Sequence, residues 1–166
     1  MSLNPALEDV RFCPRCGAEA TVAFPRSLTC PSCGYGAFYN PKPVAAVIPF
    51  DADGNVLLLR RAIDPGRGLW TFPGGFVDLG ESVPDAARRE AREELNIDVT
   101  VERLVGVYSR RDERVVLVVY TGRTQDAPVA GDEALEGRAF APAAIPTGDL
   151  AFWSTRAALR DALGSA

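Results

Sequence analysis

Three glutamates in the middle of the chain are spaced so that their side chains could share metal ions. Glu90, Glu93 and Glu94 stand at positions i, i+3 and i+4, which lie on one face of an α-helix. Carboxylates packed this closely repel one another when ionised, so the arrangement becomes favourable when divalent cations sit between them. Oxygen ligands suit Mg2+ or Mn2+, and Mg2+ is commonly held by a few carboxylates together with substrate phosphates. The alternative is a solvated helix with ion pairs such as Arg89 to Glu93.

The residues around these glutamates predict how the helix begins and ends. Ser82 is a good N-cap with Pro84 in the first turn, and Asn96 tolerates the left-handed conformation that often ends a helix. The preceding loop, residues 73–80, contains Gly74, Gly75 and Gly80. A loop of this composition can bring backbone groups close to a metal or a phosphate.

A second acidic cluster follows at residues 132–136, in a segment that contains Gly and Pro. Glu133 and Glu136 are its candidates for a catalytic base, and the sequence does not rank them. An exposed acidic loop without a catalytic role is the alternative.

The composition excludes several kinds of chemistry and partner. The chain has no histidine, which excludes a histidine base, a histidine metal ligand and a Ser-His or Cys-His nucleophile. The formal net charge of −4 disfavours a general nucleic-acid binder. No apolar run approaches the length of a membrane span, and no charged-then-apolar leader opens the chain, so we expect no membrane partner and a cytoplasmic location.

All four cysteines occur in two similar C-P-x-C-G motifs, formed by Cys13 with Cys16 and by Cys30 with Cys33. This spacing predicts a closed four-thiolate metal site with a structural role, and Zn2+ is the usual occupant. Two disulfides and a rubredoxin-like iron site are the alternatives.

The cysteine motifs predict a zinc ribbon over residues 1–40, with the metal site at about residues 11–36. The ribbon's acidic and basic side chains cancel, and four thiolates with one Zn2+ add a charge of about −2, so we expect no phosphate-binding role. Three roles stay open: stabilising the N-terminus, packing on the second domain, or supporting a homodimer.

Residues 41–166 are predicted to form the second domain. Strands are expected at residues 44–50 and 56–61, then at 99–108 and 115–120, with a further short strand at 138–140. The run VVLVVY at 115–120 indicates a buried central strand. A closing helix is expected to begin near Ser154 as its N-cap and to end before Gly164.

Gly75, Glu81 and the run from Arg89 to Leu95 have the spacing of the Nudix box, followed here by Asn96 in place of the family's glycine. The chain therefore resembles Nudix hydrolases that carry an N-terminal zinc ribbon. The resemblance implies an α/β fold, the Nudix α/β/α sandwich with a mixed sheet, preceded by the small zinc ribbon.

The secondary motifs are similar to those of ADP-ribose and FAD pyrophosphatases. These motifs are Tyr39-Asn40-Pro41-Lys42, Gly68-Leu69-Trp70-Thr71, Glu133-Ala134-Leu135-Glu136 followed by Arg138 and Phe140, and Leu150-Ala151-Phe152 near the end. The alternative group is NADH pyrophosphatase, whose SQPWPFP-like marker is absent at residues 107–112. A non-catalytic nucleotide sensor is the alternative of another class. Such a domain need not keep the glutamates, and here every one of them is present, which favours an enzyme.

The resemblance implies metal-assisted hydrolysis of a small-molecule nucleoside diphosphate. Glu90 and Glu94 would bind Mg2+ or Mn2+ directly, and Glu93 directly or through water, with a backbone carbonyl of Gly74 or Gly75 completing the shell. Glu133 or Glu136 would be the base, with Glu90 as the fallback.

The resemblance also implies supporting and substrate-contacting residues. Arg89 would orient the glutamates by ion pairing, and Glu81 would help to fix the glycine loop. Trp70 could stack on a base or flavin ring, or lie in the core. Tyr39 and Arg61 are further candidates for substrate contact.

Overall fold

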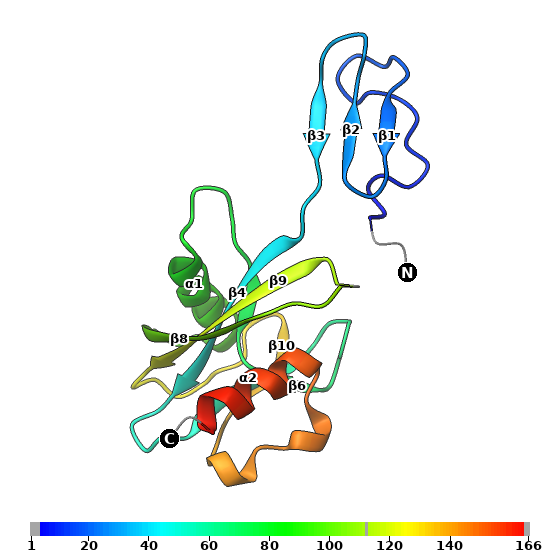
Figure 1. The fold of residues 1–166 in the computed structure, drawn as a ribbon. Helices are drawn as coiled ribbons and strands as arrows, with labels where there is room; N and C mark the ends of the chain where they lie inside the picture. The colour runs from blue at the N-terminus through cyan, green and yellow to red at the C-terminus, as the bar shows by residue number, and fades with distance from the viewer. Residues whose placement is uncertain (1–3, 112, 165–166) are drawn as a thin grey trace. The chain divides into compact units, whose positions relative to one another are not determined.

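The computed structural model describes residues 4–111 and 113–164, which divide into two compact units (Figure 1). The N-terminal unit takes residues 4–42 together with 110–111 and 113–115, and the larger unit takes 43–109 and 116–164. The boundary expected from sequence, between residues 40 and 41, lies close to this division. Nothing in the sequence assigned residues 110–115 to the N-terminal part. Within the described ranges no helix is long and apolar enough to cross a membrane.

The N-terminal unit is built on a three-stranded antiparallel sheet in the order β1-β2-β3. Its strands are β1 (Thr21–Ala23), β2 (Ser27–Thr29) and β3 (Gly36–Phe38). Leu28 on the central strand is 2% exposed and shares the small interior with Leu7, Cys13 and Cys30. So small an apolar interior is typical of domains that need a metal or disulfides for stability.

The larger unit is built on a seven-stranded sheet whose main path runs β10-β5-β4-β9-β8, with β6 pairing with β5 and β7 with β4. The strands are β4 (Lys42–Phe50), β5 (Val56–Arg61), β6 (Trp70–Thr71), β7 (Gly74–Phe76), β8 (Thr100–Tyr108), β9 (Val115–Arg123) and β10 (Ala134–Phe140).

The sheet of the larger unit is mixed. Lys42 N–H donates to the Arg114 carbonyl near the start of β4 and β9, and Thr124 N–H donates to the Phe50 carbonyl near their ends. Two strands that meet start to start and end to end are parallel. The pairs β4–β5, β5–β10 and β8–β9 are antiparallel.

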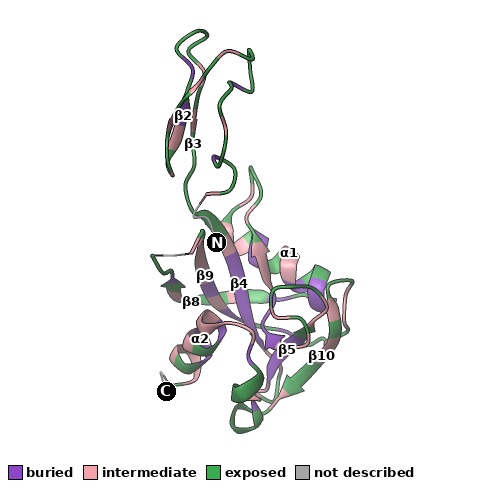
Figure 2. Ribbon diagram, turned by 90° about the vertical axis from the view of Figure 1, so that its right-hand side faces the viewer, coloured by how far each residue is buried: buried purple, intermediate pink, exposed green. Residues whose placement is uncertain are grey.

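Two helices cover opposite faces of this sheet, and alternation along β4 and β5 explains why. On β4, Ala45 and Val47 pack in the cluster beneath α1 (Val83–Leu95), whereas Ala46 and Ile48 pack in the cluster beneath α2 (Trp153–Leu163). A strand covered on both faces is buried at successive positions, as residues 45–49 of β4 are, and Figure 2 shows this strand in the colour of buried residues. The predicted α/β/α sandwich is therefore confirmed.

Strands β6 and β7 are not among the strands expected from sequence, and three further elements differ from their predictions. Strand β10 begins at Ala134 and not at residue 138, because it pairs with the whole of β5. Helix α2 begins at Trp153 after Phe152, so Ser154 lies inside the first turn and is not the N-cap. Strand β9 is internal in the sheet, but most of residues 115–120 are only partly buried.

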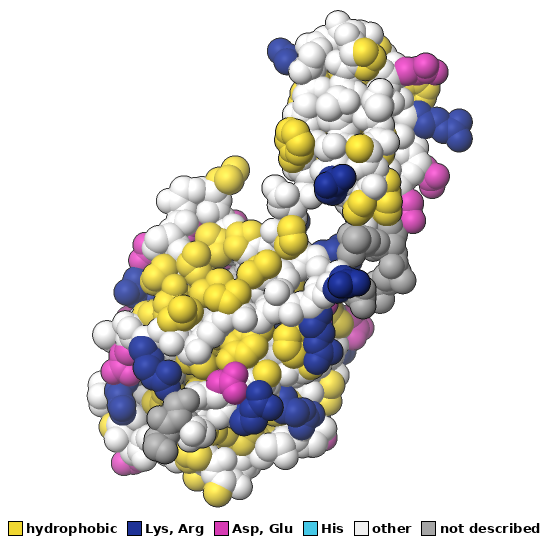
Figure 3. All heavy atoms as spheres, viewed as in Figure 1, with side chains coloured by type: hydrophobic (Ala, Val, Ile, Leu, Met, Phe, Trp, Pro, Cys, Tyr) yellow, Lys and Arg dark blue, Asp and Glu magenta, His cyan; other side chains and the backbone are white. Residues whose placement is uncertain are grey.

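An apolar band lies along the edge strand β8 and its neighbour β9. Leu104 and Val107 of β8 are 51% and 58% exposed, and they pair with Tyr120 and Val118 of β9. Figure 3 shows hydrophobic side chains gathered where these strands lie in Figure 1. Two register shifts interrupt the β8–β9 pairing, and irregularity of this kind keeps a flat strand from adding to the edge.

Candidate active site

Helix α1 has the cap residues that the sequence predicts. The Ser82 hydroxyl accepts a hydrogen bond from the Asp85 N–H at 3.3 Å. At the other end Asn96 is left-handed, with φ 52° and ψ 38°, and its N–H donates to the Arg92 carbonyl at 3.0 Å. These caps fix the register of the helix, and hence the direction in which its glutamates point.

The predicted glycine loop approaches α1 as a short strand, β7. A Cβ on Gly75 would lie 2.2 Å from Glu90 Oε1, and a Cβ on Gly74 would lie 2.6 Å from the Ala46 Cβ. Neither position can hold a larger residue without displacing its neighbour. Helix α1 can also lie close to the sheet, because the side chains on its inner face are small: Ala86, Ala87 and Ala91 are fully buried.

Glu94 is a buried carboxylate at the centre of the site. It is 6% exposed, and its Oε2 accepts a hydrogen bond from the Gly74 N–H at 2.8 Å. Burial raises its pKa to about 7; the Gly74 N–H and the charge of Arg61 lower it, and the charges of Glu90 and Glu133 raise it. Burial likewise raises the pKa of Glu90, against the lowering effect of Arg89. Two carboxylates, Glu90 and Glu133, and one cation, Arg61, act on Glu94, so negative charge is in excess around it.

Arg89 connects the glycine strand to the acidic face of α1. Its guanidinium bonds both oxygens of Glu81, at 3.0 and 3.1 Å, and donates to the Phe76 carbonyl at 2.9 Å. It also bonds Glu90 at 2.7 Å and Glu93 at 3.0 Å. Hydrogen bonding to Arg89 holds the pKa of Glu81 below its usual range. Arg89 and Glu81 therefore connect β7 to α1 through hydrogen bonds and ion pairs.

The donor set fits an open divalent-cation site. In the described parts of the chain, the four cysteines are the one group of three or more possible ligands whose atoms all lie within 4.8 Å of one another, so the glutamates form no closed cage. Glu93 is also 57% exposed and pairs with Arg89. Mg2+ keeps several waters and takes one or two carboxylates with substrate phosphates, which agrees with the Glu90 and Glu94 pair.

Glu133 and Glu136 lie in different surroundings. Glu133 immediately precedes β10, and its charge raises the pKa of both Glu90 and Glu94. Glu136 pairs with Arg138 and stands opposite Arg60 in the register. The next residue on β10, Gly137, faces Leu95 of α1, so Glu136 points to the other face of the sheet. The structure brings only Glu133 to the acidic site.

A loop contact that the sequence did not reveal positions Glu133. The Gly131 N–H donates to the Glu94 carbonyl at 2.9 Å, and a Cβ on Gly131 would lie 1.9 Å from the Glu93 carbonyl oxygen. The Glu133 carbonyl accepts from the Ala62 N–H at 2.8 Å. The loop is thereby fixed against the end of α1 and of β5. The one sequence signal for it is the glycine before the acidic run.

The three expected substrate-contact residues have different positions. Arg61 acts electrostatically on Glu94, and its side chain therefore belongs to the site. Trp70 is 7% exposed and packs edge-to-face on Phe140 with ring centroids 4.9 Å apart. Its burial favours the core alternative over stacking on a substrate. Tyr39 belongs to the N-terminal unit and is 37% exposed.

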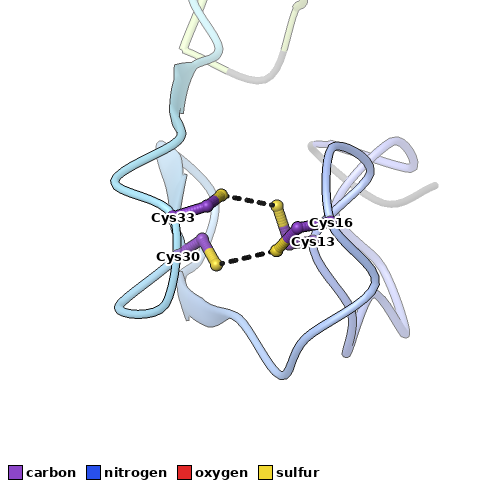
Figure 4. Close-up of side chains that lie close together, drawn as sticks. All are labelled: Cys13, Cys16, Cys30 and Cys33. Carbon is purple, nitrogen blue, oxygen red and sulfur yellow. Dashed lines mark hydrogen bonds between the residues drawn. The ribbon is translucent and has the colours of Figure 1, made fainter.

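The four cysteines converge in the N-terminal unit (Figure 4). Cys13 and Cys33 have sulfurs 3.7 Å apart, and Cys16 and Cys30 have sulfurs 3.6 Å apart. Tetrahedral thiolates about 2.3 Å from a Zn2+ would lie about 3.8 Å from one another, whereas a disulfide needs about 2.05 Å. In each motif the following glycine is left-handed and donates to the carbonyl of the first cysteine: Gly17 to Cys13 and Gly34 to Cys30.

Comparisons with known proteins agree with this geometry. The model of the NUDIX domain matches residues 40–160. An ADP-ribose pyrophosphatase from Methanocaldococcus jannaschii is 38% identical over 95 residues, covering 54% of this chain and 56% of that protein. The NAD-capped RNA hydrolase NudC of Stutzerimonas stutzeri is 34% identical over 90 residues, covering 54% of this chain and 32% of that protein. The chain thus spans less than two thirds of either relative.

A solved structure matches over more of the chain. The crystal structure of a NUDIX hydrolase from Nitrosomonas europaea has a TM-score of 0.83 and 35% identity, covering 91% of this chain and 89% of that one.

Proposed function

Because the chain belongs to the Nudix family, we propose that it hydrolyses the pyrophosphate bond of a nucleoside diphosphate linked to another group, with ADP-ribose or FAD favoured. The observation that carries the proposal is the buried Glu94 carboxylate beside Glu90, in a site with excess negative charge. The relative named as an ADP-ribose pyrophosphatase supports the substrate class. NADH pyrophosphatase activity is the alternative, and the missing marker at residues 107–112 weighs against it.

Mg2+ or Mn2+ would be held by Glu90 and Glu94, with Glu93 directly or through water and the Gly74 carbonyl as a further ligand. When bound, the ion neutralises the pyrophosphate and lowers the pKa of a water molecule. Glu133 is proposed as the base that accepts a proton from the attacking water, in preference to Glu136, because its charge acts on the site. Arg89, braced by Glu81, holds Glu90 and Glu93 in place.

The four cysteines are proposed to hold a structural Zn2+. Their sulfur separations fit a tetrahedral site, and four thiolates leave no position for a substrate.

A substrate panel tests this proposal. Zinc-loaded protein is assayed with and without added Mg2+ against ADP-ribose, FAD, NADH and nucleoside triphosphates, and monophosphate products are quantified. The metal is omitted and not chelated, because a strong chelator would also remove Zn2+ from the cysteines. We expect Mg2+-dependent turnover, fastest with ADP-ribose or FAD. Tight binding of a nucleotide without turnover would identify a sensor instead and refute the proposal.

A further inference from the structure

Phe152 has a partner that core packing does not explain. Leu150, two residues before it, and Trp153, directly after it, both belong to the apolar cluster beneath α2, whereas Phe152 is part of neither apolar cluster of the larger unit. Its ring instead lies under the guanidinium of Arg61, with the Arg61 Cζ 5.1 Å from the ring centroid. This distance is within the range of a cation–π interaction.

The rest of the Arg61 side chain is held by its own loop. Arg61 Nε donates to the Pro65 carbonyl at 2.8 Å, and a Cβ on Gly66 would lie 3.6 Å from the Arg61 Cδ and 3.2 Å from the Ala151 Cβ. The segment that carries Phe152 is itself fixed, because the Ala151 N–H donates to the Trp70 carbonyl at 2.9 Å.

These contacts order a long cationic side chain before any substrate arrives. The described hydrogen bonds of the Arg61 side chain use only Nε, and a guanidinium has five N–H donors arranged to bind phosphate oxygens. An arginine that is ordered in advance loses less conformational entropy when it binds.

We propose that Phe152 is a positioning residue, whose ring holds the Arg61 guanidinium where it can bind a substrate phosphate beside Glu94. This inference rests on the proposed function, since it assigns the phosphate-binding cation of the same site. Phe152 itself does not touch the substrate. Its removal therefore weakens substrate binding through Arg61 and leaves the chemical step unchanged.

A double-mutant cycle tests the assignment. KM and kcat for the best substrate of the panel, and the Kd of α,β-methylene-ADP with Mg2+, are measured for Phe152→Leu, Arg61→Ala and the double variant. Loss of a cation–π contact predicts a rise of about 3- to 30-fold in KM and Kd for Phe152→Leu, with kcat within about twofold. Phe152→Tyr keeps a ring and should restore both values.

In the Arg61→Ala background, Phe152→Leu should change KM and Kd by less than about twofold, because the group it positions is gone. The matched control is Phe140→Leu, which removes a ring 5.7 Å from Arg138 and should leave KM unchanged. Should Phe152→Leu fail to fold, Phe152→Met takes its place.

Three results would overturn the inference: equal effects of Phe152→Leu with and without Arg61, a fall in kcat at constant KM, or no effect at all. Equal effects in both backgrounds would mean that the ring contacts the substrate directly or acts only on folding. If the wild type hydrolyses no diphosphate, the proposed function fails, and the cycle is then read from the Kd of α,β-methylene-ADP. Failure of the wild type to bind that ligand would overturn the inference as well.

Discussion

Replacing Glu94 by Gln should stabilise the protein in the absence of Mg2+ while destroying its activity. Burial raises the pKa of Glu94 from 4.5 to about 7, so ionising this side chain opposes folding at neutral pH. At about 1.4 kcal/mol for each pKa unit, the cost of ionisation is about 3 kcal/mol. An amide can still accept from the Gly74 N–H but brings N–H donors that need partners, so we expect a net gain of about 1–2 kcal/mol.

The sign of the pH dependence follows from the same shift. The folded protein binds the Glu94 proton more tightly than the unfolded chain, so the free energy of unfolding falls as pH rises from 4.5 to about 7. The Gln variant should lack this component and retain the smaller one from Glu90, whose pKa is raised in the same direction.

Thermal unfolding of zinc-loaded wild type and Glu94→Gln in Mg2+-free buffer measures the difference. At pH 8 the variant should melt about 2–8 °C higher. At pH 4 Glu94 is protonated in the folded and the unfolded state, so only the cost of the amide remains and the variant should melt slightly lower than the wild type. Added Mg2+ should raise the wild-type melting temperature and leave the variant's nearly unchanged. A variant that melts several degrees below the wild type at pH 8 would refute the reasoning, because Glu94 would then be a structural residue and not a metal ligand.

Three further outcomes are expected. Glu133→Gln should lower kcat by at least about 100-fold and Glu136→Gln by less than about threefold, as steady-state assays at saturating Mg2+ will show; the reverse order would assign the base to Glu136. Gly75→Ala should lower activity sharply and stability by about 1–3 kcal/mol, since its Cβ would meet the Glu90 carboxylate, and an active, equally stable variant would disprove this contact. Cys13→Ser should reduce bound zinc in elemental analysis and unfold the N-terminal unit in hydrogen exchange while the larger unit stays protected; wild-type protein without zinc or iron and with paired cysteines would contradict this.

The parts of this protein that sequence predicts correctly are those fixed by neighbours along the chain. Helix α1 begins after Ser82 and ends at Asn96 as predicted, because caps act within one turn. The cysteine motifs are equally local, since each glycine closes its own turn on the preceding cysteine carbonyl.

The parts that sequence leaves open depend on distant contacts. The sequence could not decide whether Glu133 or Glu136 is the catalytic base. The answer depends on the contact of Gly131 with α1 and on the face of β10 on which each side chain lies. The burial of Trp70 follows from its contact with Phe140, far along the chain. The position of Phe152 beneath Arg61 has no local signal either.

The most direct test of a catalytic metal on the α1 carboxylates is the turnover of ADP-ribose or FAD by the wild type, Glu94→Gln and Glu136→Gln, measured side by side with Mg2+ and without it. We expect Mg2+-dependent release of two monophosphates by the wild type and by Glu136→Gln, and a loss of orders of magnitude in kcat for Glu94→Gln with the fold intact. Equal turnover by Glu94→Gln, or equal turnover by the wild type without Mg2+, would contradict the claim that the α1 carboxylates hold the catalytic metal.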